Sequence, residues 1–437
     1  MARSTDYNRF STQHRRNPAV DASSPDPAAL LTAQSGIRVH PCPSVVKNQT
    51  RLAILASHPI QYFAPWFRHL ATRFDLEVLY AHQQDASGQA EAGFGVQFEW
   101  DVPLLEGYRY GWLRNVARQP GLQSFAGCDT PELFDLVRPE RFDALLVLGW
   151  NRKSFVQGIR AAWRGGVPVI SRGDSQLRTP RSALRTFIKF LPYRWFLPRI
   201  DAHLYVGQWN KAYLRHYGVR EEQLFFSPHF VDSEFFAARA EEARVSGRAP
   251  AVREQLGIPR DAFVVLFVGK FIPKKRPGDF IAASVRASAT RTDFHALLVG
   301  DGPLRSQLKV LAKDQERIHF AGFVNQGNLP AYYSASDVVV LPGCESWGLV
   351  VNEAMACGVP AIVSDAAGCA PDLIDEGGTG SVFPTGDVAA LAQRLIDFRG
   401  ANADALRRKC AEYSMARATE GLERALTAVT CEHSTAR

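Results

Sequence analysis

The sequence predicts an α/β protein of two Rossmann-like, doubly wound domains that face each other across a cleft. Three observations support this fold class. Short apolar runs alternate with helix-like segments in two separate series, an order typical of parallel sheets with crossover helices. A polar stretch rich in Ala, Arg and Glu, residues 237–257, separates the two series. The chain has 437 residues, 46% of them hydrophobic, which is enough to bury more than one core.

The first series begins at Arg51, where the apolar run RLAILAS predicts a buried strand and the residues after it have helical spacing. The order strand, helix, strand then recurs, and a further strand is followed by a last helix. The expected strands are 51–57, 143–150, 167–174 and 201–207, and the expected helices are 59–74, 153–166 and 208–217. We therefore place a first domain at residues 51–236.

The second series follows the polar stretch, which we interpret as an interdomain linker that opens a helix. Pro277 and Pro303 predict the first turns of two helices, since proline suits that position. The expected strands are 262–269, 295–300, 318–323, 337–342 and 360–364, and the expected helices are 277–288, 303–314 and 348–357. This predicts a second domain at residues 250–412, after which a helix over 413–430 is expected to return to the first.

The amino-acid composition indicates where the protein is located and which classes of partner it can bind. Residues 1–50 are rich in Ser, Pro, Asn, Gln and Arg and lack the apolar stretch of a signal peptide, which predicts a disordered N-terminal tail. The seven cysteines are scattered without a Cys-x-x-Cys pair, which fits a reducing cytoplasm better than a disulfide framework or a zinc site. The net charge of +7 suits contact with phosphate groups, but no basic run interleaved with aromatics resembles a nucleic-acid module, so we expect no nucleic-acid partner.

One basic segment leaves a membrane contact open. Residues 178–199 alternate Arg and Lys with Phe, Leu, Tyr and Trp, while no run of about eighteen apolar residues predicts a spanning helix. The segment fits an amphipathic helix packed on its own domain, an interpretation that Pro192 and Pro198 favour because they interrupt a long helical face. The alternative is a helix that lies on an anionic membrane surface.

Two glutamates flank the start of the helix expected at 348–357. Glu345 lies in the loop that precedes this helix, and Glu353 lies in its first turns. The backbone N–H groups near Gly348 and Leu349, together with the helix dipole, make this end a candidate anion site. Two carboxylates beside such a site suit a ligand with hydroxyl groups on either side of a phosphate. A solvated loop Glu and a Glu that merely suits an early helical turn remain the alternative.

Two further loops follow strands of the second series. The loop after 262–269 holds four cations, Lys270, Lys274, Lys275 and Arg276, whose mutual repulsion an anion would relieve. A Walker A loop is excluded, because Phe271 follows the Gly-Lys step where Ser or Thr is needed. The loop VGDGPLR places Gly302 before a helix, where a ligand can approach the backbone, but it lacks the third glycine of a dinucleotide fingerprint.

The motifs of the second domain, taken together and in order, resemble those of a known family. Residues 345–353 followed by AMACGVPAIVS are similar to the Glu-x7-Glu signature of the retaining family 4 (group 1) glycosyltransferases of the GT-B fold. VGKFIPKK, LLVGDGPLRSQL, IHFAGFV and LPAYYSASDVVVLP resemble the other donor-domain segments of that family. The resemblance is dense over about residues 260–395 and covers the first domain only in outline.

The resemblance implies a role for each of these residues. Glu353 would hold the ribose diol of a nucleotide, and Glu345 a hydroxyl of the transferred sugar. Lys270 and Lys275 would bind the diphosphate. The remaining contacts with the donor would come from Gly348 and Leu349 at the helix start, from Gly302, and from Val324 beside the base.

The implied reaction is transfer of a hexose from a nucleotide-diphosphate sugar to an acceptor hydroxyl, with retention of the anomeric configuration. The sugar nucleotide is a co-substrate, so no cofactor is expected. No two aspartates are spaced i, i+2, so the sequence lacks an Asp-x-Asp metal clasp and we predict a metal-independent enzyme. The resemblance also implies a glycan or lipid-linked acceptor, polysaccharide or glycolipid synthesis, and a cytoplasmic location with contact to the inner membrane face left open.

The acceptor is expected to meet loops of the first domain. His58 follows the first strand and is a candidate to accept the acceptor's proton, although a lone loop histidine more often serves packing. Arg172 and Asp174 follow another strand and suit either a structural pair or acceptor contact. Two other functions share this outline: a nucleotide-sugar epimerase, which needs no acceptor, and a non-catalytic sugar-nucleotide-binding protein.

Overall fold

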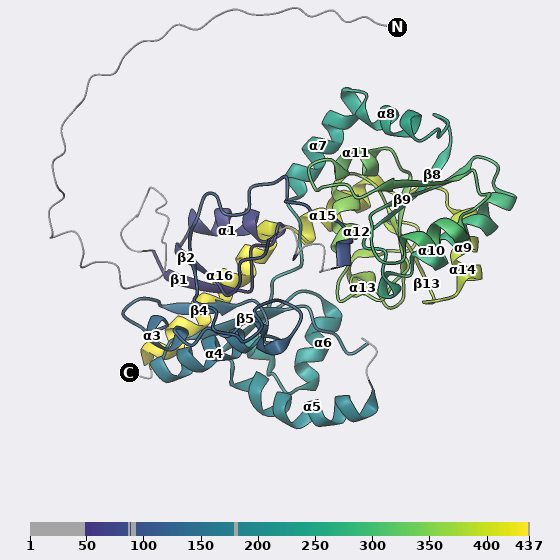
Figure 1. The fold of residues 1–437 in the computed structure, drawn as a ribbon. Coiled ribbons are helices and arrows are strands. Elements are labelled where there is room, and N and C mark those ends of the chain that lie inside the picture. Colours follow the sequence, from purple (N-terminus) through teal and green to yellow (C-terminus); the bar gives the residue numbers. More distant parts are fainter. Residues whose placement is uncertain (1–48, 86–87, 89–92, 179–181, 436–437) are drawn as a thin grey trace, which may run out of the picture. The chain divides into compact units, whose positions relative to one another are not determined.

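The computed structural model describes residues 49–435 apart from 86–87, 89–92 and 179–181. Its strands form two sheets, one of seven strands and one of six (Figure 1). Every strand pairing in the described part of the chain is parallel. The predicted α/β class with two doubly wound sheets is thus confirmed. The disordered tail predicted at 1–50 lies outside the described residues except for Gln49 and Thr50.

The first sheet has the strand order β3-β2-β1-β4-β5-β6-β7. The order reverses between β1 and β4, and in open parallel sheets a ligand crevice forms beyond the carboxyl ends of the strands at such a point. The elements of this part of the chain are β1 (Arg51–Ala56), α1 (Ala64–Ala71), β2 (Asp75–Tyr80), β3 (Arg109–Trp112), α3 (Leu133–Leu136), β4 (Ala144–Val147), α4 (Lys153–Gly165), β5 (Val169–Gly173), α5 (Ala183–Phe196), β6 (Ala202–Tyr205), α6 (Gln208–His216) and β7 (Leu224–Phe226).

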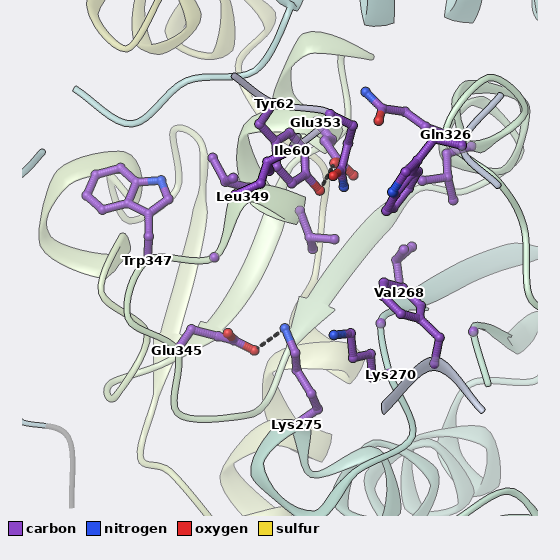
Figure 2. Close-up of a pocket in the computed structure, with 18 of the residues that line it drawn as sticks. Ile60, Tyr62, Val268, Lys270, Lys275, Gln326, Glu345, Trp347, Leu349 and Glu353 are labelled. Carbon is purple, nitrogen blue, oxygen red and sulfur yellow. Dashed lines mark hydrogen bonds and ion pairs between the residues drawn. The ribbon is translucent and has the colours of Figure 1, made fainter. Parts of the chain in front are cut away.

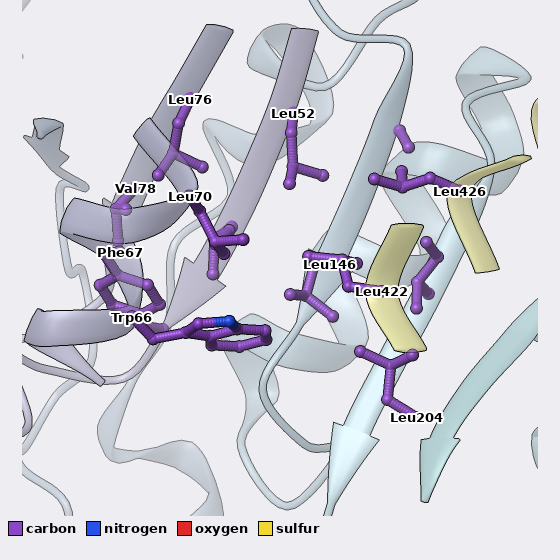
Figure 3. Packing of buried hydrophobic residues seen from close by; sticks show 14 of the residues in the cluster. Leu52, Trp66, Phe67, Leu70, Leu76, Val78, Leu146, Leu204, Leu422 and Leu426 are labelled. Atoms are coloured by element: carbon purple, nitrogen blue, oxygen red, sulfur yellow. The ribbon is translucent and has the colours of Figure 1, made fainter. Parts of the chain in front are cut away.

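The strands of the first sheet are apolar on both faces because helices cover both. Leu52 and Ile54 of β1 belong to one core and Ala53 and Leu55 to the other, which is the alternation that a pleated strand imposes. Figure 3 shows the first of these cores, where Trp66, Phe67 and Leu70 of α1 pack against the sheet.

The same core is completed from the far end of the chain. Leu422 and Leu426 of α16 (Met415–Thr435) lie against Leu146 and Leu204 of the first sheet (Figure 3). The indole of Trp66 donates a hydrogen bond of 3.0 Å to the hydroxyl of Thr419 on α16. The helix expected over residues 413–430 therefore covers strands that precede it by more than two hundred residues.

The second sheet has the strand order β10-β9-β8-β11-β12-β13, with its reversal between β8 and β11. Its central strand β8 sends Phe263, Val265 and Phe267 into one core and Val264, Leu266 and Val268 into the other. The elements are β8 (Phe263–Val268), α9 (Pro277–Thr290), β9 (Phe294–Val299), α10 (Arg305–Leu311), β10 (Ile318–Gly322), α11 (Leu329–Ser334), β11 (Val338–Leu341), α12 (Leu349–Ala356), β12 (Ala361–Ser364), α13 (Ala370–Leu373), β13 (Gly380–Phe383), α14 (Val388–Asp397) and α15 (Ala403–Glu412).

The polar stretch 237–257 differs from the linker expected there. It forms most of α7 (Ser233–Val245) and all of α8 (Arg248–Gln255), and Phe236 and Ala240 of α7 are buried in a core of the second sheet. Asp232 caps α7 by accepting a hydrogen bond of 3.0 Å from the backbone N–H of Phe235. One phenylalanine and two alanines, Phe236, Ala240 and Ala243, are enough to dock this helix, so its polar composition hid its packing. The domain limits 51–236 and 250–412 stay a prediction.

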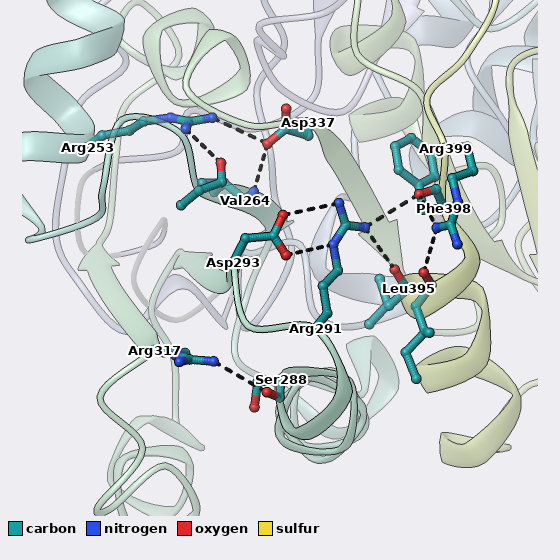
Figure 4. Close-up of polar contacts among 12 residues, drawn as sticks. Arg253, Val264, Ser288, Arg291, Asp293, Arg317, Asp337, Leu395, Phe398 and Arg399 are labelled. Carbon is teal, nitrogen blue, oxygen red and sulfur yellow. Dashed lines mark hydrogen bonds and ion pairs between the residues drawn. The ribbon is translucent and has the colours of Figure 1, made fainter.

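Structural ion pairs occupy the amino ends of the second sheet's strands (Figure 4). Asp337 accepts hydrogen bonds from the backbone N–H of Val264 at 2.7 Å and from Arg253 of α8 at 3.3 Å. Arg291 pairs with Asp293 at 3.0 Å and donates to carbonyl groups at the end of α14. A cavity of about 740 Å³ opens here, but the cations that line it are engaged in holding strand and helix ends.

Candidate active site

A cavity of about 580 Å³ lies at the opposite ends of the strands. It is lined by loops that follow the carboxyl ends of strands in both sheets, which is where ligands bind in open α/β folds. The sequence-predicted residues that line it are His58, Lys270, Lys275, Val324, Glu345, Gly348, Leu349 and Glu353.

The start of α12 lies at the edge of this cavity. Gly348 precedes the helix with φ of +116°, and a Cβ at this position would lie 2.5 Å from the Leu341 side chain, so only glycine fits. No side chain caps the helix. The first backbone N–H groups of α12, from Leu349 onward, therefore give this edge of the cavity a positive electrostatic potential.

Glu345 and Lys275 form an ion pair beside this helix start (Figure 2). Lys275 comes from the short 3₁₀ turn after β8, and Glu345 comes from the loop after β11, where its side chain is 10% exposed. The backbone carbonyl of Glu345 accepts a hydrogen bond from the buried amide of Gln176. Two loops that are remote in sequence thus place one cation and one carboxylate together, and Gln176, from the loop after β5, holds the backbone of Glu345.

Glu353 lies deeper, on the first turns of α12, and is 1% exposed. One carboxylate oxygen accepts a hydrogen bond of 2.8 Å from the Tyr62 hydroxyl (Figure 2), and the other accepts one from Tyr333. Burial raises the pKa of Glu353 to about 7, and the two tyrosine hydroxyls partly offset this effect by stabilising the charged form. The carboxyl group is therefore a buried acceptor whose protonation changes near neutral pH.

Lys270 lies in the same cavity, with its ammonium group directed toward that of Lys275 (Figure 2). Burial and the neighbouring charge of Lys275 lower the pKa of Lys270 to about 8. Its Nζ lies 4.1 Å from the ring centroid of Phe94, an aromatic residue of the first part of the chain. Because the ammonium groups of Lys270 and Lys275 line the same cavity, this region is a candidate site for a doubly charged anion.

The end of the cavity away from Lys275 and Glu345 is lined by apolar side chains and by the amide of Gln326 (Figure 2). Val324, Phe323 and Leu329 line it together with Gln326, whose side chain is 5% exposed. The Oε1 atom of Gln326 is buried and accepts no hydrogen bond from the described residues. Since an unsatisfied buried acceptor is costly, this amide is suited to an N–H donor of a bound ligand.

Gly302, unlike the other predicted donor-binding residues, does not line the cavity. Gly300 and Asp301 line the cavity, whereas Gly302 packs on the backbone of Phe271, where a Cβ would lie 2.9 Å from its nitrogen. Its φ of +150° and this close approach explain the glycine without a ligand.

The first sheet contributes the other wall. The His58 ring lines the cavity, and its Nδ1 lies 2.9 Å from the Ser57 hydroxyl. Burial lowers the pKa of His58 to about 4, so the imidazole is neutral at pH 7. Asp174 lines the cavity as well and accepts a hydrogen bond from Ser346, the neighbour of Glu345.

Arg172 lies elsewhere and does not line the cavity. Its buried guanidinium donates a hydrogen bond of 2.6 Å to the carbonyl of Pro228 and lies over the rings of Trp66 and Phe230. It therefore has a structural role in the first core. Among the described residues, no group of three or more His, Cys, Asp or Glu side chains is arranged to hold a metal ion.

Sequence reasoning missed several residues of the site. Tyr62 and Tyr333 hold Glu353 from two different halves of the chain, and Gln326 supplies the buried amide. Tyr62 comes four residues after His58, within the helix expected over 59–74; the structure instead has a turn there and begins α1 at Ala64, which leaves the Tyr62 side chain at the cavity. Tyr333 lies on a short helix, and nothing in its local sequence indicates its partner.

The second half of the chain is similar in sequence to known glycosyltransferases. Residues 249–417 match the family described as glycosyl transferases group 1. The chain is 34% identical over 149 residues to N-acetyl-alpha-D-glucosaminyl L-malate synthase of Bacillus anthracis, covering 33% of this chain and 38% of that protein. It is 28% identical over 278 residues to D-inositol 3-phosphate glycosyltransferase of Acidothermus cellulolyticus, covering 56% of this chain and 60% of that protein. The chain thus spans about half the length of the curated relatives it matches.

Solved structures share the fold over most of the chain. The structure of Anabaena Alr3699/HepE in complex with UDP and glucose has a TM-score of 0.61 at 17% identity, with 86% of this chain and 99% of that chain covered. A glycosyltransferase from Rickettsia africae has a TM-score of 0.62 at 14% identity, with 89% and 98% covered. Residues 249–417 thus match the group 1 glycosyltransferases, and the chain has the GT-B fold that these solved structures share.

Proposed function

We propose that the protein transfers a hexose from a nucleoside-diphosphate sugar to an acceptor hydroxyl and retains the configuration at the anomeric carbon. One observation carries the proposal: Glu345, Glu353, Lys270 and Lys275 line one cavity around the start of α12. The match of residues 249–417 to the group 1 glycosyltransferases, and the UDP and glucose bound to Anabaena HepE, support the choice of ligand.

The diphosphate is proposed to lie at the start of α12, between the two lysines. The helix N-terminus and two ammonium groups supply the positive potential that this group requires. A bound diphosphate would also relieve the repulsion between Lys270 and Lys275 that lowers the pKa of Lys270. Glu345 pairs with Lys275 in the structure, so a sugar held by Glu345 would lie directly beside the phosphates.

The nucleoside is proposed to extend from the diphosphate toward Glu353 and Gln326. Each oxygen of the Glu353 carboxylate accepts one tyrosine hydrogen bond and retains capacity for a second, so both hydroxyls of a ribose diol can donate to it. The base would then meet Val324 and the unsatisfied amide oxygen of Gln326, which favours a base with an N–H donor on its edge.

In the proposed reaction, the bond between the anomeric carbon and the diphosphate oxygen breaks while the acceptor oxygen bonds to the same carbon from the same face. The acceptor's proton leaves on the departing diphosphate, and neutral His58 is the alternative proton acceptor in the cavity. Lys270, Lys275 and the helix start stabilise the charge that builds on the leaving group. Because these cations belong to the chain, we propose a metal-independent reaction.

The acceptor is proposed to be a glycan or a lipid-linked saccharide that meets Asp174 and His58 of the first sheet. A role in cell-surface polysaccharide or glycolipid synthesis, a cytoplasmic location and peripheral contact with the membrane follow from the resemblance to the family and belong to the same proposal. No helix in the described residues combines the length and apolar character needed to cross a bilayer.

The deciding experiment measures nucleotide release from a panel of UDP-, GDP- and ADP-sugars, with and without candidate acceptors. We expect release with one donor class and faster release when a suitable acceptor is present. Interconversion of the free nucleotide sugar without an acceptor would instead identify an epimerase. Binding of nucleotide without turnover on any acceptor would indicate a non-catalytic binding protein, and absence of calorimetric binding to UDP, GDP and ADP would contradict the donor site itself.

A further inference from the structure

Helix α5 exposes an unusual amount of apolar surface. Five of its large hydrophobic side chains are more than half exposed: Leu184 at 67%, Phe187 at 76%, Ile188 at 63%, Leu191 at 68% and Trp195 at 56%. Their spacing of three, one, three and four residues places them on one side of the helix. We call these five side chains the α5 stripe. Single exposed apolar residues are common on protein surfaces, but a contiguous exposed apolar patch usually marks an interaction site.

The opposite side of α5 anchors the helix to the first sheet's domain. Phe190, Tyr193 and Phe196 pack against one of its two cores. The ring centroid of Tyr193 lies 5.4 Å from that of Tyr217, and the ammonium group of Lys189 donates to the Tyr213 hydroxyl. The interpretation of residues 178–199 as a helix packed on its own domain therefore holds for one side of α5, while the other side is apolar and exposed.

The charged residues of the segment that carries the stripe all have the same sign. Residues 175–200 contain six basic residues and no acidic residue; the basic ones are Arg178, Arg181, Arg185, Lys189, Arg194 and Arg199. Arg194 and Arg199 are exposed, and the guanidinium of Arg199 lies 4.2 Å from the ring centroid of Trp195, whereas Arg178 lies over the ring of Trp209 and donates to the carbonyl of Asp365. A tryptophan beside arginines is the combination that sits at the boundary between acyl chains and headgroups.

We propose that the α5 stripe docks on an anionic lipid bilayer. The five apolar side chains enter the interfacial region, while the flanking arginines contact lipid phosphates. Charge decides against a second copy of the chain as the occupant. A symmetric contact through this face would bring two stripes with the same basic flanks together, and no acidic residue in 175–200 is present to pair with them.

The position of α5 relates this docking to the cavity. β5 ends at Gly173, the next residue Asp174 lines the cavity, and Gln176 donates to the carbonyl of Glu345. α5 begins seven residues after Gln176. Docking would thus hold the acceptor side of the cavity near the bilayer. Only this last consequence rests on the proposed transferase function; the docking itself rests on α5 alone.

The test is co-sedimentation of the full chain with vesicles of phosphatidylcholine alone and of phosphatidylcholine with about one-third phosphatidylglycerol. We expect binding to the anionic vesicles that falls with added salt and is much weaker on the neutral ones. The double variant F187E/L191E should reduce binding to anionic vesicles at least about tenfold, because it removes two apolar contacts and adds two negative charges.

The matched control is V245E/V310E, which adds the same charge at residues that are 79% and 73% exposed on other helices. The control should bind anionic vesicles within about twofold of the unaltered chain. Equal losses in both double variants, equal binding to neutral and anionic vesicles, or no vesicle binding would each overturn the proposal. A dimer in light scattering that F187E/L191E dissociates, without vesicle binding, would assign the stripe to a second copy instead.

Nucleotide binding is measured on the same samples to separate this proposal from the proposed function. Unchanged UDP or GDP affinity in F187E/L191E, with lost vesicle binding, supports docking and leaves the donor site intact. Vesicle binding without any nucleotide affinity would support docking while contradicting the transferase. Thermal unfolding midpoints of both double variants should match the unaltered chain, since all four residues are exposed.

Discussion

The hydroxyl of Tyr62 donates a hydrogen bond of 2.8 Å to the carboxylate of Glu353, joining two residues that are 291 positions apart. Tyr62 comes from the segment after the first strand of the first sheet, and Glu353 comes from α12 of the second sheet's domain. The buried carboxylate therefore has one partner from each half, since Tyr333 supplies the other hydroxyl. The site's chemistry depends on this contact in ways that can be measured.

Tyr62→Phe should destabilise the protein by about 1–2 kcal/mol at pH 8, because a buried ionised acceptor loses one of its two side-chain donors. Urea unfolding followed by circular dichroism measures this difference. Tyr332→Phe is the control, since it removes a half-buried tyrosine hydroxyl from a neighbouring position on α11. An equal loss of unfolding free energy in both variants would show that the hydrogen bond from Tyr62 to Glu353 does not stabilise the fold more than an ordinary tyrosine hydroxyl does.

The raised pKa of Glu353 predicts a pH-dependent stability. Its pKa is about 7 in the folded chain against an ordinary value of 4.5, so between these values the folded state keeps a proton that the unfolded state has released. The stabilising contribution is complete below pH 4.5 and is lost as the pH rises through 7. The loss amounts to about 3 kcal/mol for this group.

Glu353→Gln should remove that dependence. The amide does not titrate, so the difference in unfolding free energy between unaltered chain and variant should shift in favour of the variant by about 2–3 kcal/mol from pH 5 to pH 8. Denaturant titrations at both values measure it. A difference that stays constant with pH would mean that Glu353 titrates near its ordinary value.

Lys270 predicts the pH dependence of nucleotide binding. Its pKa is about 8 without ligand, and a bound diphosphate would raise it, so affinity for UDP or GDP should be full below pH 8 and should fall above it. Lys270→Arg should flatten the fall between pH 8 and pH 9.5, because arginine stays charged throughout. Isothermal titration calorimetry gives both affinities, and parallel curves for the two proteins would contradict this role.

Lys275→Ala should lower kcat by about 10² to 10³, as expected for loss of one donor that stabilises the leaving diphosphate. Lys274 is the matched control, since it is adjacent on the same turn but exposed and absent from the cavity lining. Lys274→Ala should keep kcat within about twofold. Near-normal turnover in Lys275→Ala, or an equal loss in both variants, would count against the assignment.

Substitution of His58 distinguishes two possible acceptors of the proton from the acceptor hydroxyl, the His58 ring and the departing diphosphate. Since its low pKa keeps the ring neutral at pH 7, His58→Ala should lower kcat by about 10² or more if the ring accepts the proton. His58→Asn restores a hydrogen-bonding group without the base and should not recover the rate. Full activity in His58→Ala would assign the proton to the departing diphosphate.

Local sequence patterns were sufficient to predict many of the strands and helices, because buried parallel strands are continuous apolar runs. The run at β8 and the proline at the first turn of α9 act within a few residues, and the structure has both elements where they were expected. Shorter or more mixed strands such as β3 and β13 escaped this pattern, since four residues carry little periodicity. The helices α7 and α8 escaped it because polar composition concealed a narrow buried stripe.

The sequence by itself determined the two series of strands, the helix that begins after Gly348, and the charges on the loops beside it, because each depends on residues close together in the chain. Only the tertiary structure decided that Lys275 meets Glu345, that Tyr62 reaches Glu353, that Gly302 is turned away from the cavity, and that α5 keeps one apolar side uncovered. Those outcomes depend on packing between segments far apart in sequence, and hydrophobic burial and hydrogen-bond geometry select among partners that no local pattern specifies.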